Sequence, residues 1–139
     1  AGAGNLSVST SGAVTFTADI DLSEGTHRCN CSFCTKARAW FAIVNADHVH
    51  FAPGAEAAQS DYQWTPPGRP SVLHFQFCRT CGVRVAAWGT APQFGGKFYA
   101  VAIASLDGVS RDELAAAPIR YVDGRNDRFT EPPADTRLL

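Results

Sequence analysis

Residues 27–36 read HRCNCSFCTK, and this stretch places three of the chain's five cysteines within six positions. The three are Cys29, Cys31 and Cys34, and the other two, in the stretch FCRTCG, are Cys78 and Cys81. The CxCxxC and CxxC spacings, with an odd total, do not match the disulfide frameworks of small secreted domains. In a cytoplasmic chain such spacing is typical of metal binding or catalysis, so we expect a cytoplasmic protein whose cysteines serve one of these roles.

The composition is that of a globular protein, and the length fits a single domain over residues 1–139. Hydrophobic residues make up 45% and charged residues 18% of the chain, which is enough apolar material for a core without disulfide bonds. The formal net charge of −1 offers no basic surface for phosphates, so we expect no nucleic-acid partner. No apolar run approaches the length of a membrane span, so we expect no membrane partner.

Alternation of apolar and polar side chains predicts a mainly β fold. Residues 14–20, VTFTADI, alternate with a period of two, and residues 73–77, LHFQF, do the same. Further strands are expected in residues 39–51, 83–85, 97–106 and 119–124. Ser110 and Glu113 have the spacing of a capping box, which predicts one short helix over residues 110–117.

Two segments rich in proline, glycine and small residues are expected to be loops. They are residues 52–71 and residues 89–97, and long loops inside a compact domain often form functional flaps. Both are candidates to wall a pocket. The strands on either side of FCRTCG are expected to meet in a knuckle, where Gly82 can adopt a positive φ.

Two metal arrangements fit the cysteine spacing, because zinc accepts sulfur ligands in a tetrahedral shell. In the first, the CxxC pairs Cys31/Cys34 and Cys78/Cys81 form a closed structural site, and Cys29 is spare. In the second, Cys29, Cys31 and Cys34 hold the ion alone and leave its fourth position open, as in catalytic zinc sites. The spacing by itself does not choose between them.

Segments along most of the chain resemble the family of glutathione-dependent formaldehyde-activating enzymes, to which the centromere protein V domain also belongs. In the family's order, the matching segments are SGAVTF (11–16), CNCSFC (29–34), FQFCRTCGV (75–83), SLDGV (105–109) and RYVDGRND (120–127). The resemblance implies a β-tent of stacked antiparallel sheets, with one short helix and a zinc-knuckle hairpin. It also implies an open zinc site of three cysteines, which matches Cys29, Cys31 and Cys34, and a closed four-cysteine site.

The sequence departs from the family at the closed site. That site combines an early CxC with the later CxxC, but the early positions are Ser9 and Ser11 in this chain. A neutral hydroxyl is a poor zinc ligand beside thiolates. We therefore expect one zinc per chain at the three-cysteine site, and only a weak half-site at Cys78 and Cys81. Asn30 stands where the family frequently has histidine, and the sequence assigns it no role.

The resemblance implies a carbon–sulfur lyase similar to S-(hydroxymethyl)glutathione synthase. Its partners would be glutathione and formaldehyde, and its product would be S-hydroxymethylglutathione. Cys29, Cys31 and Cys34 would then be the catalytic residues, because they hold the zinc. The alternative is a non-catalytic zinc-binding module that stores formaldehyde adducts or binds a protein.

Several side chains near the cysteines are candidates for handling the substrate. Arg28, Lys36 and Arg38 could bind the carboxylates of glutathione, although a solvated basic rim has the same composition. His27 could move a proton, but a lone histidine is more often a surface or packed side chain.

Overall fold

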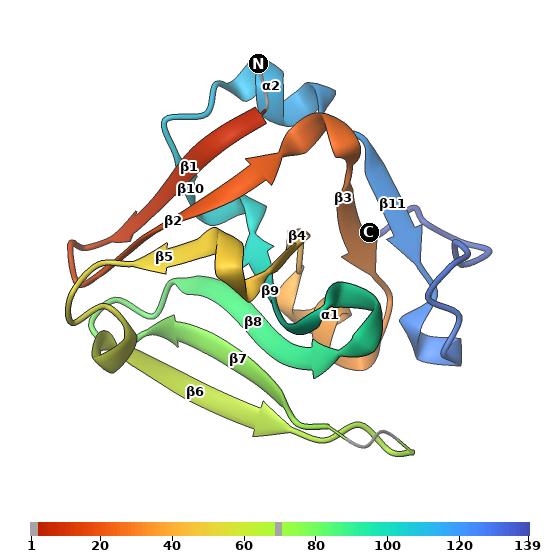
Figure 1. Cartoon of the computed structure of the whole chain (residues 1–139). Coiled ribbons are helices and arrows are strands. Elements are labelled where there is room, and N and C mark those ends of the chain that lie inside the picture. Colours follow the sequence, from red (N-terminus) through yellow and green to blue (C-terminus); the bar gives the residue numbers. More distant parts are fainter. Residues whose placement is uncertain (1–2, 69–70) are drawn as a thin grey trace.

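The computed structural model describes residues 3–68 and 71–139, and the fold is mainly β (Figure 1). The strands are β1 (Ala3–Thr10), β2 (Val14–Asp21), β3 (Thr26–Cys29), β4 (Phe41–Asn45), β5 (Val49–Phe51), β6 (Gln59–Trp64), β7 (Leu73–Cys78), β8 (Arg84–Ala91), β9 (Gly96–Ala102), β10 (Leu106–Asp107) and β11 (Ile119–Val122). The α-helices are α1 (Ser32–Ala37) and α2 (Arg111–Ala116). The 3-10 turns are η1 (Leu22–Glu24), η2 (Ala46–His48), η3 (Glu56–Ala58), η4 (Pro92–Phe94), η5 (Ile103–Ser105) and η6 (Gly124–Asn126).

The prediction of a mainly β protein is confirmed, and α2 is the helix that the capping box predicted. The Ser110 side chain accepts the backbone N–H of Glu113 at 3.1 Å. The structure adds α1, which lies inside the cysteine stretch and which the sequence analysis does not foresee. Among the described residues, no helix has the length and apolar character that crossing a membrane requires.

Two stacked sheets form the fold. The smaller sheet has the strand order β10-β1-β2-β5, and the larger has the order β11-β3-β4-β9-β8-β7-β6. Figure 1 shows the smaller sheet above β6, β7 and β8 of the larger one. The strand pairs are antiparallel, except that β11 runs parallel to β3 with Val122 opposite Cys29. This arrangement agrees with the expected stack of antiparallel sheets.

The core lies between the sheets, and strand alternation selects its members. On β2, Val14, Phe16, Ala18 and Ile20 are buried, while the residues between them are more exposed. Across the core, the larger sheet contributes fully buried side chains such as Val85 and Val101. Each buried side chain of this size contributes about 1.5–3 kcal/mol.

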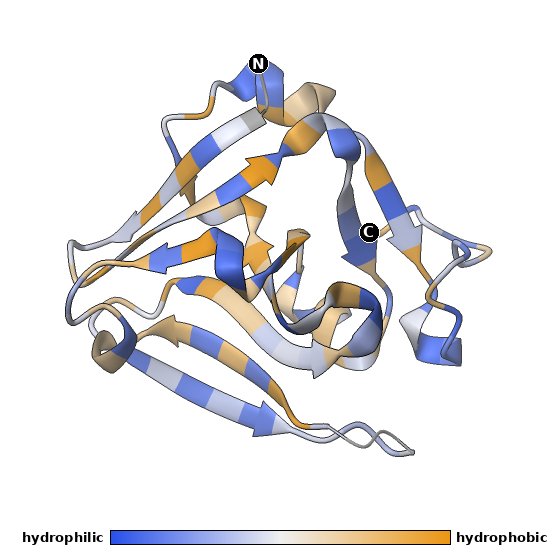
Figure 2. Cartoon of the chain, viewed as in Figure 1, coloured by the Kyte–Doolittle hydropathy of each residue, from blue (hydrophilic) through white to orange (hydrophobic). Residues whose placement is uncertain are grey.

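The two loop predictions were wrong in part. Strand β6 occupies residues 59–64, inside the predicted loop 52–71, and pairs with β7 along its whole length. Figure 2 shows mostly hydrophilic colours along β6, so periodicity gives no signal for it. In the predicted loop 89–97, β8 continues to Ala91 and β9 begins at Gly96, which leaves only a tight turn. Edge strands can form through backbone pairing without an apolar face.

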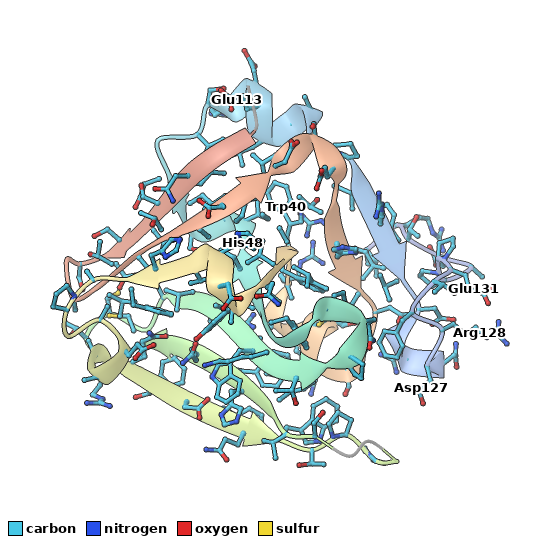
Figure 3. The ribbon with its side chains drawn as sticks, viewed as in Figure 1. Trp40, His48, Glu113, Asp127, Arg128 and Glu131 are labelled. Atoms are coloured by element: carbon cyan, nitrogen blue, oxygen red, sulfur yellow. The ribbon has the colours of Figure 1, made fainter. Side chains whose placement is uncertain are left out.

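Hydrogen bonds of Thr26 connect three parts of the chain close to the cysteine stretch. Its fully buried hydroxyl accepts Trp40 Nε1–H at 2.7 Å and donates to the Pro118 carbonyl at 3.0 Å. Figure 3 shows Trp40 between the ribbons of the two sheets. The backbone N–H of Thr26 donates to the same Pro118 carbonyl at 2.7 Å. The start of β3 is thereby fixed to β11 and to the segment that leads into β4.

We expect Thr26→Val to lower the free energy of unfolding by about 1–3 kcal/mol, because valine keeps the shape but leaves Trp40 Nε1–H buried without an acceptor. Urea unfolding followed by tryptophan fluorescence measures the change. Thr90→Val, at an exposed position on β8, is the matched control and should stay within about 0.5 kcal/mol of the unmodified chain. Equal losses in both variants would contradict the role assigned to the Thr26 hydroxyl.

Candidate metal centre

Three cysteine sulfur atoms come together where β3 ends and α1 begins. Cys29 is the last residue of β3, Cys31 is the N-cap of α1, and Cys34 lies in the first turn of that helix. Their Sγ atoms all lie within 4.8 Å of one another. The sharp change from strand to helix allows three residues so close in sequence to present their sulfur atoms to one point.

Backbone amides hold two of the sulfur atoms in place. The N–H of Cys31 donates to Cys29 Sγ at 3.4 Å, and the N–H of Cys34 donates to Cys31 Sγ at 3.3 Å. Cys31 thus fills the N-cap position that serine, threonine, asparagine or aspartate usually takes. Positive partial charge at the start of a helix favours a thiolate there.

The three cysteines form hydrogen bonds with one another, and these bonds give their thiols different pKa values. Hydrogen bonds from Cys29 and then Cys34 lower the pKa of Cys31 to about 2. The same hydrogen bonding raises the pKa of Cys34, mainly through its bond with Cys29, and the bond with Cys31 raises the pKa of Cys29. The first negative charge therefore forms more readily in the cluster than on an isolated thiol.

The donor set fits zinc. Zinc binds cysteine sulfur at roughly 2.3 Å, so two sulfur ligands of one ion lie at most about 4.6 Å apart. Sulfur atoms within 4.8 Å of one another can converge on one ion with only small side-chain movements. Among the described residues, this is the one cluster of three or more cysteine, histidine or acidic side chains with such spacing.

The loop that follows β11 is hydrogen-bonded to the cysteine turn through Asn30. The Asn30 side chain donates to Asp123 Oδ1 at 2.8 Å and accepts the backbone N–H of Arg125 at 3.0 Å. Asp123 is buried, and hydrogen bonds from Asn126 and then Asn30 lower the pKa of its carboxyl group. Asn30 therefore fixes the cysteine turn, a role that its sequence position did not suggest.

Gly124 brings the backbone of the same loop against the cysteines. A Cβ atom at this position would lie 2.5 Å from Cys29 Sγ and 3.5 Å from Cys31 Cβ. Glycine is therefore the residue that the packing requires here. Figure 3 shows Asp127, Arg128 and Glu131 further along the chain, on the outer side of the molecule. The only sequence signal for this loop is its place in the segment RYVDGRND.

A small hollow opens beside Cys29 and Cys34. Its lining residues are Arg28, Cys29, Cys34, Thr35, Arg38, Ala39, Leu138 and Leu139. The Arg28 guanidinium lies 5.0 Å from the centroid of the Trp40 ring, which holds the cation by a cation–π contact. Two of the three predicted substrate-binding residues, Arg28 and Arg38, thus border the hollow. The third, Lys36, lies in the last turn of α1 and is not part of the lining.

Arg84 is a cation near the cysteines that the sequence analysis missed. Its guanidinium lies 4.9 Å from the centroid of the Phe33 ring, and Phe33 stands between Cys31 and Cys34 in the sequence. Burial lowers the pKa of Arg84, and the electrostatic interaction with Cys34 acts in the opposite direction. Arg84 therefore places positive charge close to the sulfur cluster from β8, a strand about fifty residues further along the chain.

The segment with the two serines does approach the CxxC knuckle. Ser11 Oγ lies 3.8 Å from Cys78 Sγ, while Ser9 Oγ pairs with the Thr15 hydroxyl at 3.1 Å. Cys78 is fully buried in the core, Cys81 is exposed, and Gly82 has the predicted positive φ of 78°. The nearby Thr10 hydroxyl, and then the knuckle amides, lower the pKa of Cys78 to about 6.

Other candidates from the sequence lie apart from the hollow. His27 faces away from Arg28, stacks on Phe41 with ring centroids 5.7 Å apart, and lines a separate depression with β11. Burial, and then the nearby charge of Arg120, lower the pKa of His27, so the ring is neutral at pH 7. The described residues of the segments 52–71 and 89–97 contribute nothing to the lining, so they do not wall this hollow.

The sequence profile of one protein family matches residues 9–122, which is more than half of the chain. The family is described as glutathione-dependent formaldehyde-activating enzyme. The matched range includes all five cysteines and both serines discussed above. No curated protein and no solved structure matches the chain.

We expect one zinc per chain, held by the three-cysteine cluster. Cys29→Ser should weaken zinc binding by more than about 100-fold, because loss of a ligand exceeds the 10–100-fold effect typical of outer contacts. Cys81→Ser should change it little, since Cys81 is exposed and outside the cluster. Elemental analysis and competition with a chromogenic chelator measure both quantities. Two zincs per chain would contradict the single site, and metal loss in Cys81→Ser but not in Cys29→Ser would instead support the closed structural site formed by the two CxxC pairs.

Gly124→Ala should reduce zinc affinity by on the order of 10–100-fold, because the new methyl group must push Cys29 out of place. Gly54→Ala is the control: open space surrounds that position, although its φ of 81° makes alanine strained. It should lower thermal stability without changing the zinc content. The same chelator competition compares the two variants. Full zinc affinity in Gly124→Ala would show that the loop does not confine Cys29.

Proposed function

Because the chain belongs to the family of glutathione-dependent formaldehyde-activating enzymes, we propose that it is a zinc-dependent carbon–sulfur lyase. Its substrate in this proposal is a small thiol adduct, with S-hydroxymethylglutathione as the first candidate. The observation that carries the proposal is the position of the sulfur cluster, which forms one side of a hollow bordered by two arginines.

Cys29, Cys31 and Cys34 would hold the zinc ion in this proposal. Bound there, zinc would supply an open fourth position at which an incoming thiol is held as the thiolate. The backbone amides of Cys31 and Cys34 keep the sulfur atoms oriented before any ligand arrives. The Asn30–Asp123 contact and Gly124 limit how far the cysteine turn can move.

The arginines would select and orient the thiol. Arg28 and Arg38 reach the hollow from opposite ends of the cysteine turn, and a guanidinium binds carboxylate through charge-assisted hydrogen bonds. Glutathione carries two carboxylates, so one molecule can meet both arginines while its sulfur points to the cluster. Arg84 would offset the negative charge that accumulates as a further thiolate enters.

The reaction needs no oxidant or reductant. In the synthetic direction the thiolate sulfur attacks the carbonyl carbon of formaldehyde, and a carbon–sulfur bond forms. The carbon–oxygen π pair moves onto oxygen, which takes a proton from water. In the reverse direction the hydroxyl loses its proton, the carbon–sulfur bond breaks, and thiolate and formaldehyde are released.

The state of the cysteines suits a reducing compartment. All five lie in the described part of the chain, and none takes part in a disulfide bond. A site that depends on thiolates works where thiols stay reduced, so we place the protein in the cytoplasm. Glutathione is also a thiol of that compartment.

Cobalt substitution tests this function, because the visible spectrum of cobalt bound to sulfur changes with its fourth ligand. Titration of glutathione into the cobalt form should shift the spectrum until it saturates. S-methylglutathione keeps the carboxylates but has no free thiol, and it should cause no such shift. Added salt should weaken glutathione binding, since exposed charge contacts are screened at about 0.1 M ionic strength and above.

Cys31→Ser should abolish the spectral response and thereby link it to the sulfur cluster. Production and breakdown of S-hydroxymethylglutathione should then be faster with the zinc form than with the Cys31→Ser variant. A cobalt spectrum that does not change with any added thiol would mean that a group of the protein itself fills the fourth coordination position of the metal. In that case the alternative, a non-catalytic zinc-binding module, would replace the lyase.

A further inference from the structure

The last residues of the chain lie in the hollow beside the sulfur cluster. Leu138 and Leu139 form part of its lining, next to Cys29 and Cys34. The Leu138 carbonyl oxygen accepts a hydrogen bond from Arg38 Nη1 at 2.5 Å. Residues 136–139, called the tail segment below, therefore border the place where the arginines would meet a thiol, and Leu138 takes a hydrogen bond from one of them.

The residue that makes this contact, Arg38, has an unusual backbone conformation. It ends α1 in the left-handed conformation, with φ 54° and ψ 44°, where glycine is the usual residue. A side chain in this conformation costs about 1 kcal/mol or more. The chain nevertheless has arginine at this position, and its guanidinium binds a peptide carbonyl more than ninety residues away.

The tail segment is held weakly enough to leave. Leu138 is 78% exposed, so it adds little apolar burial. Within the tail, the N–H of Leu139 donates to the Thr136 carbonyl at 3.1 Å, which makes a local turn. The firm attachment lies upstream, where the Glu131 carbonyl accepts the N–H of Asp123 at 3.1 Å. Residues 132–139 can therefore move away while residue 131 stays in place.

We propose that the tail segment is a built-in competitor for the thiol site, which a ligand must displace to reach the sulfur cluster. The Leu138 carbonyl is neutral, whereas a carboxylate makes a charge-assisted bond to Arg38 of roughly twice the strength. Thiols that carry a carboxylate displace the tail, and small neutral thiols do not. The tail thus restricts the site to anionic thiols. The thiol part of this inference rests on the proposed function; the tail contact stands apart from it.

Tethering makes a weak contact effective. A segment joined to its own binding site acts at an effective concentration of about millimolar, so a modest affinity keeps the site mostly covered. The apparent affinity of any competing ligand falls by the fraction of molecules in which the site is open. A chain ending at Asp135 should therefore bind glutathione roughly three- to tenfold more tightly than the full chain.

The decisive experiment uses a peptide, because it needs neither metal nor thiol. A fluorescent, amidated hexapeptide with the sequence of residues 134–139 is titrated with the shortened chain and with the full chain, and anisotropy reports binding. The shortened chain should bind it several-fold more tightly. Arg38→Gln in the shortened chain should remove this binding, whereas Arg111→Gln, on the distant helix α2, should not.

Calorimetry with glutathione on the zinc-loaded proteins completes the test. The shortened chain should bind glutathione with the higher affinity. Excess peptide should lower this affinity to the value measured for the full chain. Equal affinities of both chains for peptide and for glutathione would overturn the tail proposal and leave the lyase proposal standing. Selective peptide binding, with no glutathione binding to either chain, would uphold the tail contact and remove glutathione as the substrate.

Discussion

The parallel pairing of β11 with β3 is the contact on which the candidate metal centre depends. Parallel strands end at the same edge of a sheet, so the cysteine turn after β3 and the loop after β11 leave the sheet side by side. This position allows Asn30 to bind Asp123, and it brings Gly124 against Cys29. Without the β11 ladder, the three sulfur atoms would be arranged only by their own short turn.

The fold does not depend on a second zinc ion. Cys78 is fully buried within the main hydrophobic cluster. Ser11 fills the neighbouring position without placing a second sulfur there. Small domains need structural zinc because their cores are too small, whereas a chain of 139 residues buries enough surface without one.

Positive charge reaches the sulfur cluster from three separate parts of the chain. Arg28 comes from β3, Arg38 follows α1, and Arg84 comes from β8. Each is fixed by a different contact: a tryptophan ring, a peptide carbonyl and a phenylalanine ring. Thiolates that gather in one place repel each other, and these cations offset that repulsion. In the proposed function, the same charges would favour an anionic thiol over a neutral one.

Local sequence determined the features that depend on neighbouring residues. The alternation in residues 14–20 identified the buried face of β2, the Ser110–Glu113 spacing identified α2, and the CxCxxC spacing offered the sulfur cluster as one of two arrangements. In each case the interacting groups lie within a few positions, so strand or helix periodicity brings them together.

Tertiary structure alone decided the features that join distant segments. Strand β6 has no periodic hydrophobic signal because its residues are mostly polar. It gains its structure from backbone pairing with β7. The partners of Asn30 and Arg38 lie more than ninety residues away along the chain. Hydrogen bonds of this kind form only after the sheets have brought their ends together, and no local pattern in the sequence records which ends will meet.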